Sequence, residues 1–128
     1  MRTGARGFTL VELVIVVAII AIIGTIAVAN YEDYISRGRR SDAVSALTEM
    51  ANLQSRFYSN NLTYTADLGS LPYPSTTMEG YYSLSIPVLT TTTFTLRATA
   101  VGLQAAKDPD CPTMSLTHLG AKTPEDCW

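Results

Sequence analysis

The start of the chain is an uninterrupted apolar stretch. From Phe8 to Ala29 the sequence is apolar except for Thr9, Glu12 and Thr25. As a helix rising about 1.5 Å per residue, this stretch reaches roughly 33 Å, enough to cross a bilayer core of about 30 Å. The pattern therefore predicts a membrane-spanning helix. Because a carboxylate inside a span is costly, we expect Glu12 to meet a cationic partner.

A short basic segment, MRTGARG, precedes the apolar stretch. It contains Arg2 and Arg6 and no acid, which predicts a cytoplasmic N-terminus with the rest of the chain outside. A secretory signal has a shorter apolar region, about 7 to 15 residues, that ends in a small-residue cleavage site. Here the apolar stretch is longer, and the best cleavage signal lies in front of it, where Gly7 meets Phe8.

The polar and apolar pattern after the span predicts more helix. Residues 31–60 continue without a strong breaker, so we expect a single helix of more than roughly 45 residues, although Gly38 and Ser41 leave a break near residues 37–40 open. One face should pack on a core. Its apolar residues are Ala43, Ala46, Met50, Leu53 and Phe57, widened by Val44 and Leu47.

The remaining sequence predicts a small α+β domain. Residues 60–80 form a connecting region that should lie on the core through Leu62, Tyr64, Leu68, Leu71 and Tyr73. Alternating residues predict strands at 82–88, 94–100 and 114–119, with residues 89–93 as a hairpin loop. Pro87 should end the first strand or lie at a sheet edge. We expect a three- or four-stranded antiparallel sheet packed on the second half of the helix.

Composition narrows the possible functions. Without the leader and span, about 99 residues remain, enough for one small domain. The formal charge of −2 does not indicate a nucleic-acid-binding protein. Cys111 and Cys127, with a single histidine and no second cysteine pair, make poor zinc ligands. In an exported segment we expect them to form a disulfide.

The string Gly7-Phe8-Thr9-Leu10-Val11-Glu12, followed by an apolar helix and by Tyr31 and Tyr34, resembles the N-terminus of type IV pilins and pseudopilins. In that family a prepilin peptidase cuts after the glycine and methylates the new amino terminus. The resemblance implies processing at Gly7 and Phe8. It also gives Glu12 a partner, because the amine on Phe8 of a neighbouring subunit can neutralise it during assembly.

One feature departs from the family pattern. Relatives often carry a proline shortly before the first tyrosine, whereas residues 27–30 here read Ala-Val-Ala-Asn. Unwinding of the span during assembly involves that proline in the family. Gly24 is the remaining weak point of the predicted helix.

The resemblance also implies an organisation and a location. Residues 1–7 would be the cleaved leader, 8–30 the transmembrane or filament-core half of the helix, and 31–128 a globular pilin domain on the spine of the helix. The protein would be a single-pass inner-membrane protein with a periplasmic C-terminal domain, then part of an extracellular pilus. Its partners would be other pilin subunits, the prepilin peptidase, the pilus assembly machinery and, before assembly, inner-membrane lipid. No cofactor is implied.

The C-terminal Cys127-Trp128 resembles PilE-like minor pilins, which suggests a minor subunit supporting assembly, adhesion or twitching motility. The alternatives are a major pilin, a type II secretion pseudopilin and a DNA-binding competence pilin. A DNA-binding pilin would need a basic strip, for which the candidates are Arg97, Lys107 and Lys122. A plain membrane anchor is the simplest alternative to all of these.

Other candidate chemistry is weaker. Arg37, Arg39 and Arg40 form the densest basic cluster and could contact phosphate of lipid or DNA, but such a cluster is commonly a solvated or subunit-contacting surface. Calcium could be held by acids near the C-terminus, although Asp-Pro-Asp is as readily a turn. Those acids are Asp108, Asp110, Glu125 and Asp126. His118 is best interpreted as structural or exposed, and no catalytic set can be assembled, so we do not expect an enzyme.

Overall fold

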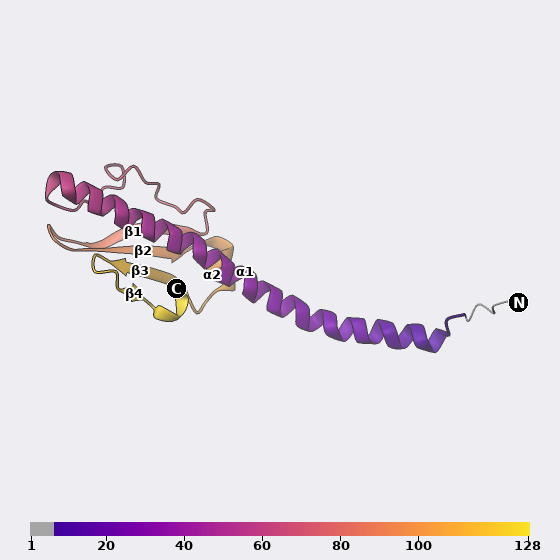
Figure 1. The fold of residues 1–128 in the computed structure, drawn as a ribbon. Helices are drawn as coiled ribbons and strands as arrows, with labels where there is room; N and C mark the ends of the chain where they lie inside the picture. The colour runs from indigo at the N-terminus through magenta and orange to yellow at the C-terminus, as the bar shows by residue number, and fades with distance from the viewer. Residues whose placement is uncertain (1–6) are drawn as a thin grey trace, which may run out of the picture. The chain divides into compact units, whose positions relative to one another are not determined.

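The computed structural model describes residues 7–128, apart from the side chain of Ala29. The chain divides into two compact units, one ending at Glu32 and the other comprising Asp33–Trp128. Residues 1–6 of the predicted leader, with Arg2 and Arg6, lie outside the described residues. The elements in order are α1 (Leu10–Asn61), β1 (Tyr82–Leu89), β2 (Phe94–Ala100), α2 (Gly102–Lys107), β3 (Thr113–Thr117), β4 (Lys122–Thr123) and a 3-10 helix, η1 (Glu125–Cys127) (Figure 1).

Helix α1 has 52 residues and contributes to both units. It continues through Gly24 and Gly38, which confirms the prediction of one long helix, and the break left open near residues 37–40 does not occur. At that place the Ser41 hydroxyl donates a hydrogen bond of 2.6 Å to the Gly38 carbonyl. Bonding of a serine hydroxyl back to the preceding turn lets this residue sit inside a helix.

The sheet is antiparallel, as predicted, and its four strands, the upper number expected, lie in the order β1-β2-β3-β4. The loop between β1 and β2 is closed by Thr90 and Thr93, whose backbone groups and hydroxyls bond to each other. Strand β1 is an edge strand, and its register shifts between Ser85 and Val88, around Pro87. This position agrees with the prediction for Pro87, because a residue without an N–H disturbs a ladder least at an edge.

The core lies between the sheet and the part of α1 that follows Asp33. Ala43, Leu47 and Met50 of α1 are fully buried, and they cluster with residues from β1, β2 and β3 and with both cysteines. The residues from the strands are Tyr82, Leu84, Phe94, Leu96, Ala98, Ala100, Met114 and Leu116. The connecting region packs against this core through the partly buried Tyr64, Leu68 and Tyr73, and its Leu71 is buried, whereas Leu62 is exposed, contrary to expectation.

The buried stripe of α1 ends on a polar residue that the sequence analysis missed. Leu53 and Phe57 are only partly buried, and Gln54 is completely buried instead. The amide of Gln54 bonds both backbone groups of Thr65, accepting from its N–H at 3.1 Å and donating to its carbonyl. A backbone segment that crosses the core needs such partners, so Gln54 fixes the start of the connecting region to α1.

Candidate functional site

The residues around the predicted cleavage position lie just before α1. Gly7, Phe8 and Thr9 precede the helix, and the Thr9 hydroxyl accepts a hydrogen bond of 3.2 Å from the backbone N–H of Glu12. Thr9 is therefore the N-cap, and Glu12 occupies the first turn. The spacing Thr-x-x-Glu before an apolar run is itself a helix-start signal in the sequence. That spacing alone would have predicted Thr9 as the N-cap.

Glu12 lies where the dipole of its own helix stabilises a negative charge. A carboxylate in the first turn interacts with the positive end of the helix dipole, by about 0.3 to 1 kcal/mol. Its side chain is exposed, and within residues 7–128 the structure assigns it no cationic partner. As far as the described residues show, the carboxylate of Glu12 is available to an amine of another subunit, as the predicted pairing requires.

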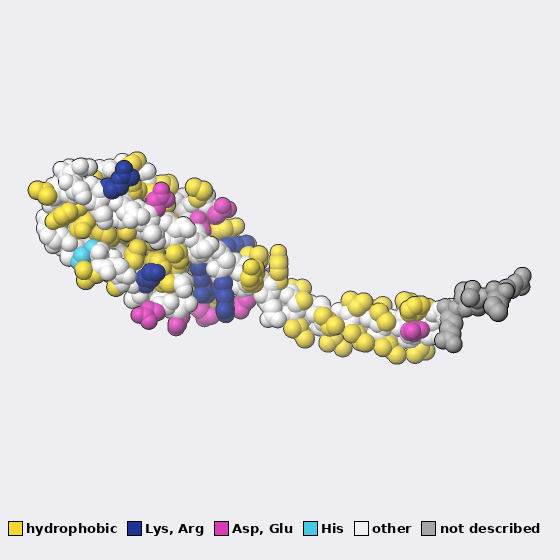
Figure 2. Space-filling view, viewed as in Figure 1, with side chains coloured by type: hydrophobic (Ala, Val, Ile, Leu, Met, Phe, Trp, Pro, Cys, Tyr) yellow, Lys and Arg dark blue, Asp and Glu magenta, His cyan; other side chains and the backbone are white. Residues whose placement is uncertain are grey.

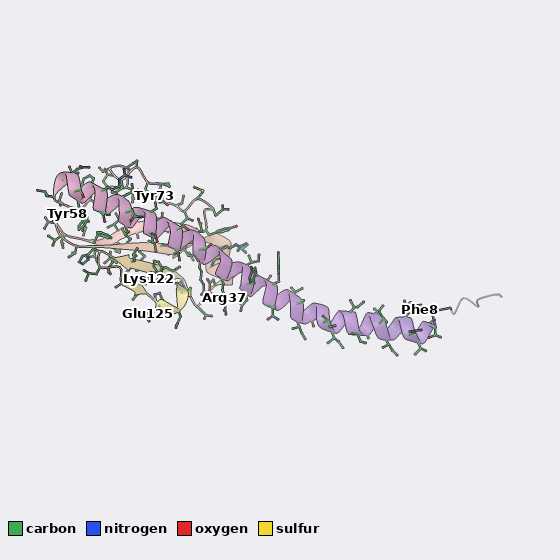
Figure 3. The ribbon with its side chains drawn as sticks, in the orientation of Figure 1. Phe8, Arg37, Tyr58, Tyr73, Lys122 and Glu125 are labelled. Atoms are coloured by element: carbon green, nitrogen blue, oxygen red, sulfur yellow. A yellow bond between two sulfur atoms is a disulfide. The ribbon has the colours of Figure 1, made fainter. Side chains whose placement is uncertain are left out.

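The fold itself does not explain glycine at position 7. A Cβ added to Gly7 would meet no heavy atom within 4 Å, and its φ is not in the left-handed region. Phe8 is equally unconstrained, with 77% of its surface exposed. Figure 3 shows Phe8 at the start of the described helix. Neither residue has a packing role among the described residues.

The first half of α1 exposes its apolar side chains on all sides. Within the described chain it is the one helix long and apolar enough to cross a membrane by length and composition, and none of its most apolar window is buried. Figure 2 shows hydrophobic side chains along the visible face of this half. A helix that is apolar all round is stable only where lipid or other helices cover it.

The predicted disulfide joins Cys111 and Cys127, with their Cα atoms 5.8 Å apart. Both cysteines are buried, and strands β3 and β4 lie inside the loop that the bond closes. Lys122 of β4 lies 5.0 Å from the centre of the Trp128 ring, on which it forms a cation–π contact. The disulfide thus joins the two ends of the C-terminal segment, and both of its cysteines belong to the core of the domain.

The arginine cluster at residues 37–40 does not form one basic surface. Arg37 makes an exposed contact of 3.9 Å with Asp33, while Arg39 lies 4.6 Å from the centre of the Tyr81 ring. Arg40 points elsewhere, into the domain. Its Nε and Nη2 atoms each lie 2.7 Å from a carboxylate oxygen of Asp108.

The Arg40–Asp108 pair is the centre of a buried polar network. The Asp108 side chain is only 5% exposed, and its hydrogen bonds with Arg40 raise the pKa of the Arg40 guanidinium. The fully buried amide of Gln104, from α2, lies 3.0 Å from Asp108, 3.0 Å from the Tyr82 hydroxyl and 3.1 Å from the Ser36 carbonyl. Asp108 and Gln104 together therefore connect α1, α2 and β1, and Asp108 is committed to this network.

Other acids suggested for calcium do not assemble a site. Within the described part of the chain, no three metal-ligating acids, histidines or cysteines come together. His118 is exposed, with its ring centre 6.2 Å from that of Phe94. This position agrees with the structural or surface role expected for it.

The candidate basic strip is divided between faces of the sheet. Arg97 of β2 is opposite Ser115 of β3, whereas Lys122 of β4 is opposite Leu116. Neighbouring residues of a strand point to opposite faces, and Leu116 faces the core. Arg97 and Lys122 therefore belong to different faces, and Lys107 ends helix α2.

Comparisons with known proteins cover most of the chain. A family model described as type IV minor pilin ComP, DNA uptake sequence receptor, matches residues 29–115, and the prokaryotic N-terminal methylation motif matches residues 2–28. The chain is 31% identical to the fimbrial protein EcpC of Eikenella corrodens, covering 87% of this chain and 72% of EcpC. It is 30% identical to the type IV major pilin protein PilE1 of Neisseria gonorrhoeae, covering 69% of this chain and 42% of PilE1.

Solved structures agree with these relatives. A type IV pilin from Shewanella oneidensis is 36% identical, with a TM-score of 0.57, and the match covers 73% of this chain and 97% of that chain. The minor pilin PilV of Neisseria meningitidis has the same TM-score at 21% identity, which shows a shared fold.

Proposed function

The chain belongs to the type IV pilin family, and we propose that it is a minor pilin that a prepilin peptidase cleaves after Gly7 and methylates on Phe8. As in the family, it assembles with other pilins into a pilus. In this proposal residues 1–7 are the leader, 8–30 the membrane and filament-core half of the helix, and 31–128 the pilin domain. The protein waits in the inner membrane with its domain in the periplasm, then enters the extracellular filament.

The surroundings of Gly7 and Phe8 support the proposed cleavage. Gly7 and Phe8 lie directly before a capped helix, and nothing in the described fold requires glycine at position 7. Recognition by the peptidase would account for a glycine that packing does not require. Cleavage would place the new amine one residue before the N-cap Thr9.

The assembly step uses Glu12. Burial of the apolar half of α1 against neighbouring helices removes water from around this carboxylate, so its charge needs a partner. The amine of Phe8 on a neighbouring subunit supplies one. Side-by-side packing of apolar helices provides little hydrophobic discrimination in lipid or in a filament core, so this pairing would contribute to specificity.

The minor role is supported by the ComP minor pilin model, which matches most of the domain. The relatives of the PilE type are themselves named major pilins, so a major role is the nearest alternative. Abundance in the filament separates the two.

The experiment is mass spectrometry of the full-length protein from sheared filaments and, separately, from membranes. A species beginning at methylated Phe8, present in filaments at a small fraction of a more abundant pilin, is expected. Gly7→Leu should block cleavage, whereas Glu12→Gln should be cleaved normally but incorporated poorly. The proposal would be overturned if the unaltered protein kept its leader, or if the protein were absent from filaments.

DNA binding is a second candidate, because the matching family model describes a DNA uptake sequence receptor. The distribution of basic residues argues for a weak site at most, since Arg40 is committed to Asp108, and Arg97 and Lys122 face different sides. Binding of duplex DNA to the full-length protein in detergent at about 50 and 200 mM salt tests this function. A specific site would keep discriminating between sequences as salt weakens the phosphate contacts.

A further inference from the structure

A groove of about 640 Å³ lies on the domain between α1 and the segment that leads into β1. Its lining combines tyrosines and carboxylates from both elements, including Tyr34, Asp42, Glu49, Tyr73, Glu79 and Tyr81. Figure 3 shows Tyr73 on the segment that runs beside α1. The groove belongs neither to the disulfide-closed segment nor to the start of α1.

Negative charge dominates this groove. Three carboxylates line it, whereas the single cation in the lining, Arg39, lies on the ring of Tyr81. One carboxylate oxygen of Asp42 is buried and has no hydrogen-bond partner among the described residues. Because that oxygen is buried, a cation in the groove would interact with Asp42 through its charge rather than through a hydrogen bond to this atom.

The tyrosines complement the charge. Tyr73 donates a hydrogen bond of 3.3 Å to Glu49, and burial, together with that carboxylate, raises the pKa of Tyr73. Tyr73 presents a neutral aromatic surface beside this carboxylate. Tyr34 and Met78, 76% and 94% exposed, add uncovered apolar area around the groove. Aromatic faces beside carboxylates suit an organic cation with an alkyl stem.

We infer that this groove receives a lysine or arginine side chain from a neighbouring pilin subunit in the filament. The inference rests on the proposed function, which places the domain against other pilins. Charge complementarity selects the occupant, because the groove offers acids and aromatic rings and lacks a free cation of its own. Pilin surfaces can supply such a group: in the described part of this chain Arg56 and Arg97 are exposed and hold no ion pair. A groove on one subunit and a side chain on another face make a heterologous contact, which can propagate without closing.

The test is photo-crosslinking in intact filaments. A benzophenone-bearing residue replaces Met78 in the full-length chain, and crosslinked peptides from sheared filaments are identified by mass spectrometry. We expect crosslinks to a pilin peptide that contains lysine or arginine. Glu79→Gln, alone and with Asp42→Asn, should reduce their yield by about fivefold. The matched control is Glu125→Gln, an exposed acid outside the groove.

Each outcome has a distinct meaning. Normal incorporation without a pilin crosslink at position 78 would overturn the groove contact and leave the proposed function intact. Crosslinks that persist unchanged in the amide variants would identify a neutral occupant and also overturn it. Absence of the unaltered chain from filaments would remove the proposed function, and this contact with it.

Discussion

Removing the guanidinium of Arg40 should destabilise the domain by about 3 to 5 kcal/mol, the cost of breaking a buried ion pair. Both oxygens of Asp108 are bound by Arg40 at 2.7 Å, and the Asp108 side chain is only 5% exposed. In Arg40→Met the aliphatic stem is kept but Asp108 is left as a buried charge with Gln104 as its remaining side-chain donor. For a domain of about 96 residues, with a stability of roughly 5 to 14 kcal/mol, this is a large fraction.

The measurement is urea unfolding of the full-length protein in detergent micelles, followed by the fluorescence of Trp128, the single tryptophan. Arg37→Met is the matched control. Its partner Asp33 lies 3.9 Å away and both side chains are more than two-thirds exposed, so a change within about 0.5 kcal/mol is expected. The double variant Arg40→Met with Asp108→Asn should lose less than the sum of the single changes, by about 1 to 3 kcal/mol. A loss below about 1 kcal/mol in Arg40→Met, or strict additivity, would refute the reasoning.

Three further predictions concern the domain. Gln54→Ala should lower the free energy of unfolding by about 1 to 3 kcal/mol, because both backbone groups of Thr65 lose their partner. An unchanged free energy of unfolding would contradict the role given to this amide. Cys111→Ser with Cys127→Ser should cost about 2 to 5 kcal/mol, and reductant should lower the stability of the unaltered protein equally. Burial raises the pKa of Tyr82, because the folded protein favours the neutral phenol. The stability that Tyr82 contributes is therefore fully present below the unfolded pKa of about 10 and is lost as the pH rises through the folded pKa. Circular dichroism between pH 9 and 12 should show a shallower alkaline loss in Tyr82→Phe.

Local periodicity was sufficient to predict the long helix and the three main strands. The alternation of residues 82–88 and 94–100 places apolar side chains on one face, and Pro87 marks an edge, so strand and position follow from the same residues. Helix α2 was missed because its six residues are too few for a periodic signal and its one buried side chain, Gln104, is polar. Strand β4, with two residues, has no pattern to detect.

The long-range polar contacts could not be predicted. Arg40 and Asp108 are 68 residues apart, and each looked like part of a local cluster, one basic and one acidic. Only the fold reveals that they satisfy each other. The cysteine pair was predictable because two cysteines in a segment expected to be exported have few alternatives. At the start of α1, the motif indicated Gly7, Phe8 and Glu12, whereas the capping role of Thr9 emerged from geometry.

The two edges of the sheet affect how many copies of the chain can lie close together without aggregating. Strand β1 is interrupted around Pro87, which lacks an N–H, and strand β4 has only two residues. Neither edge offers a long row of free backbone groups on which a strand from another molecule could add. Many copies can therefore be concentrated at a membrane or in a fibre without fusing their sheets into one continuous ladder. Recognition between neighbouring domains must then come from side chains, which can be altered one at a time without rebuilding the sheet.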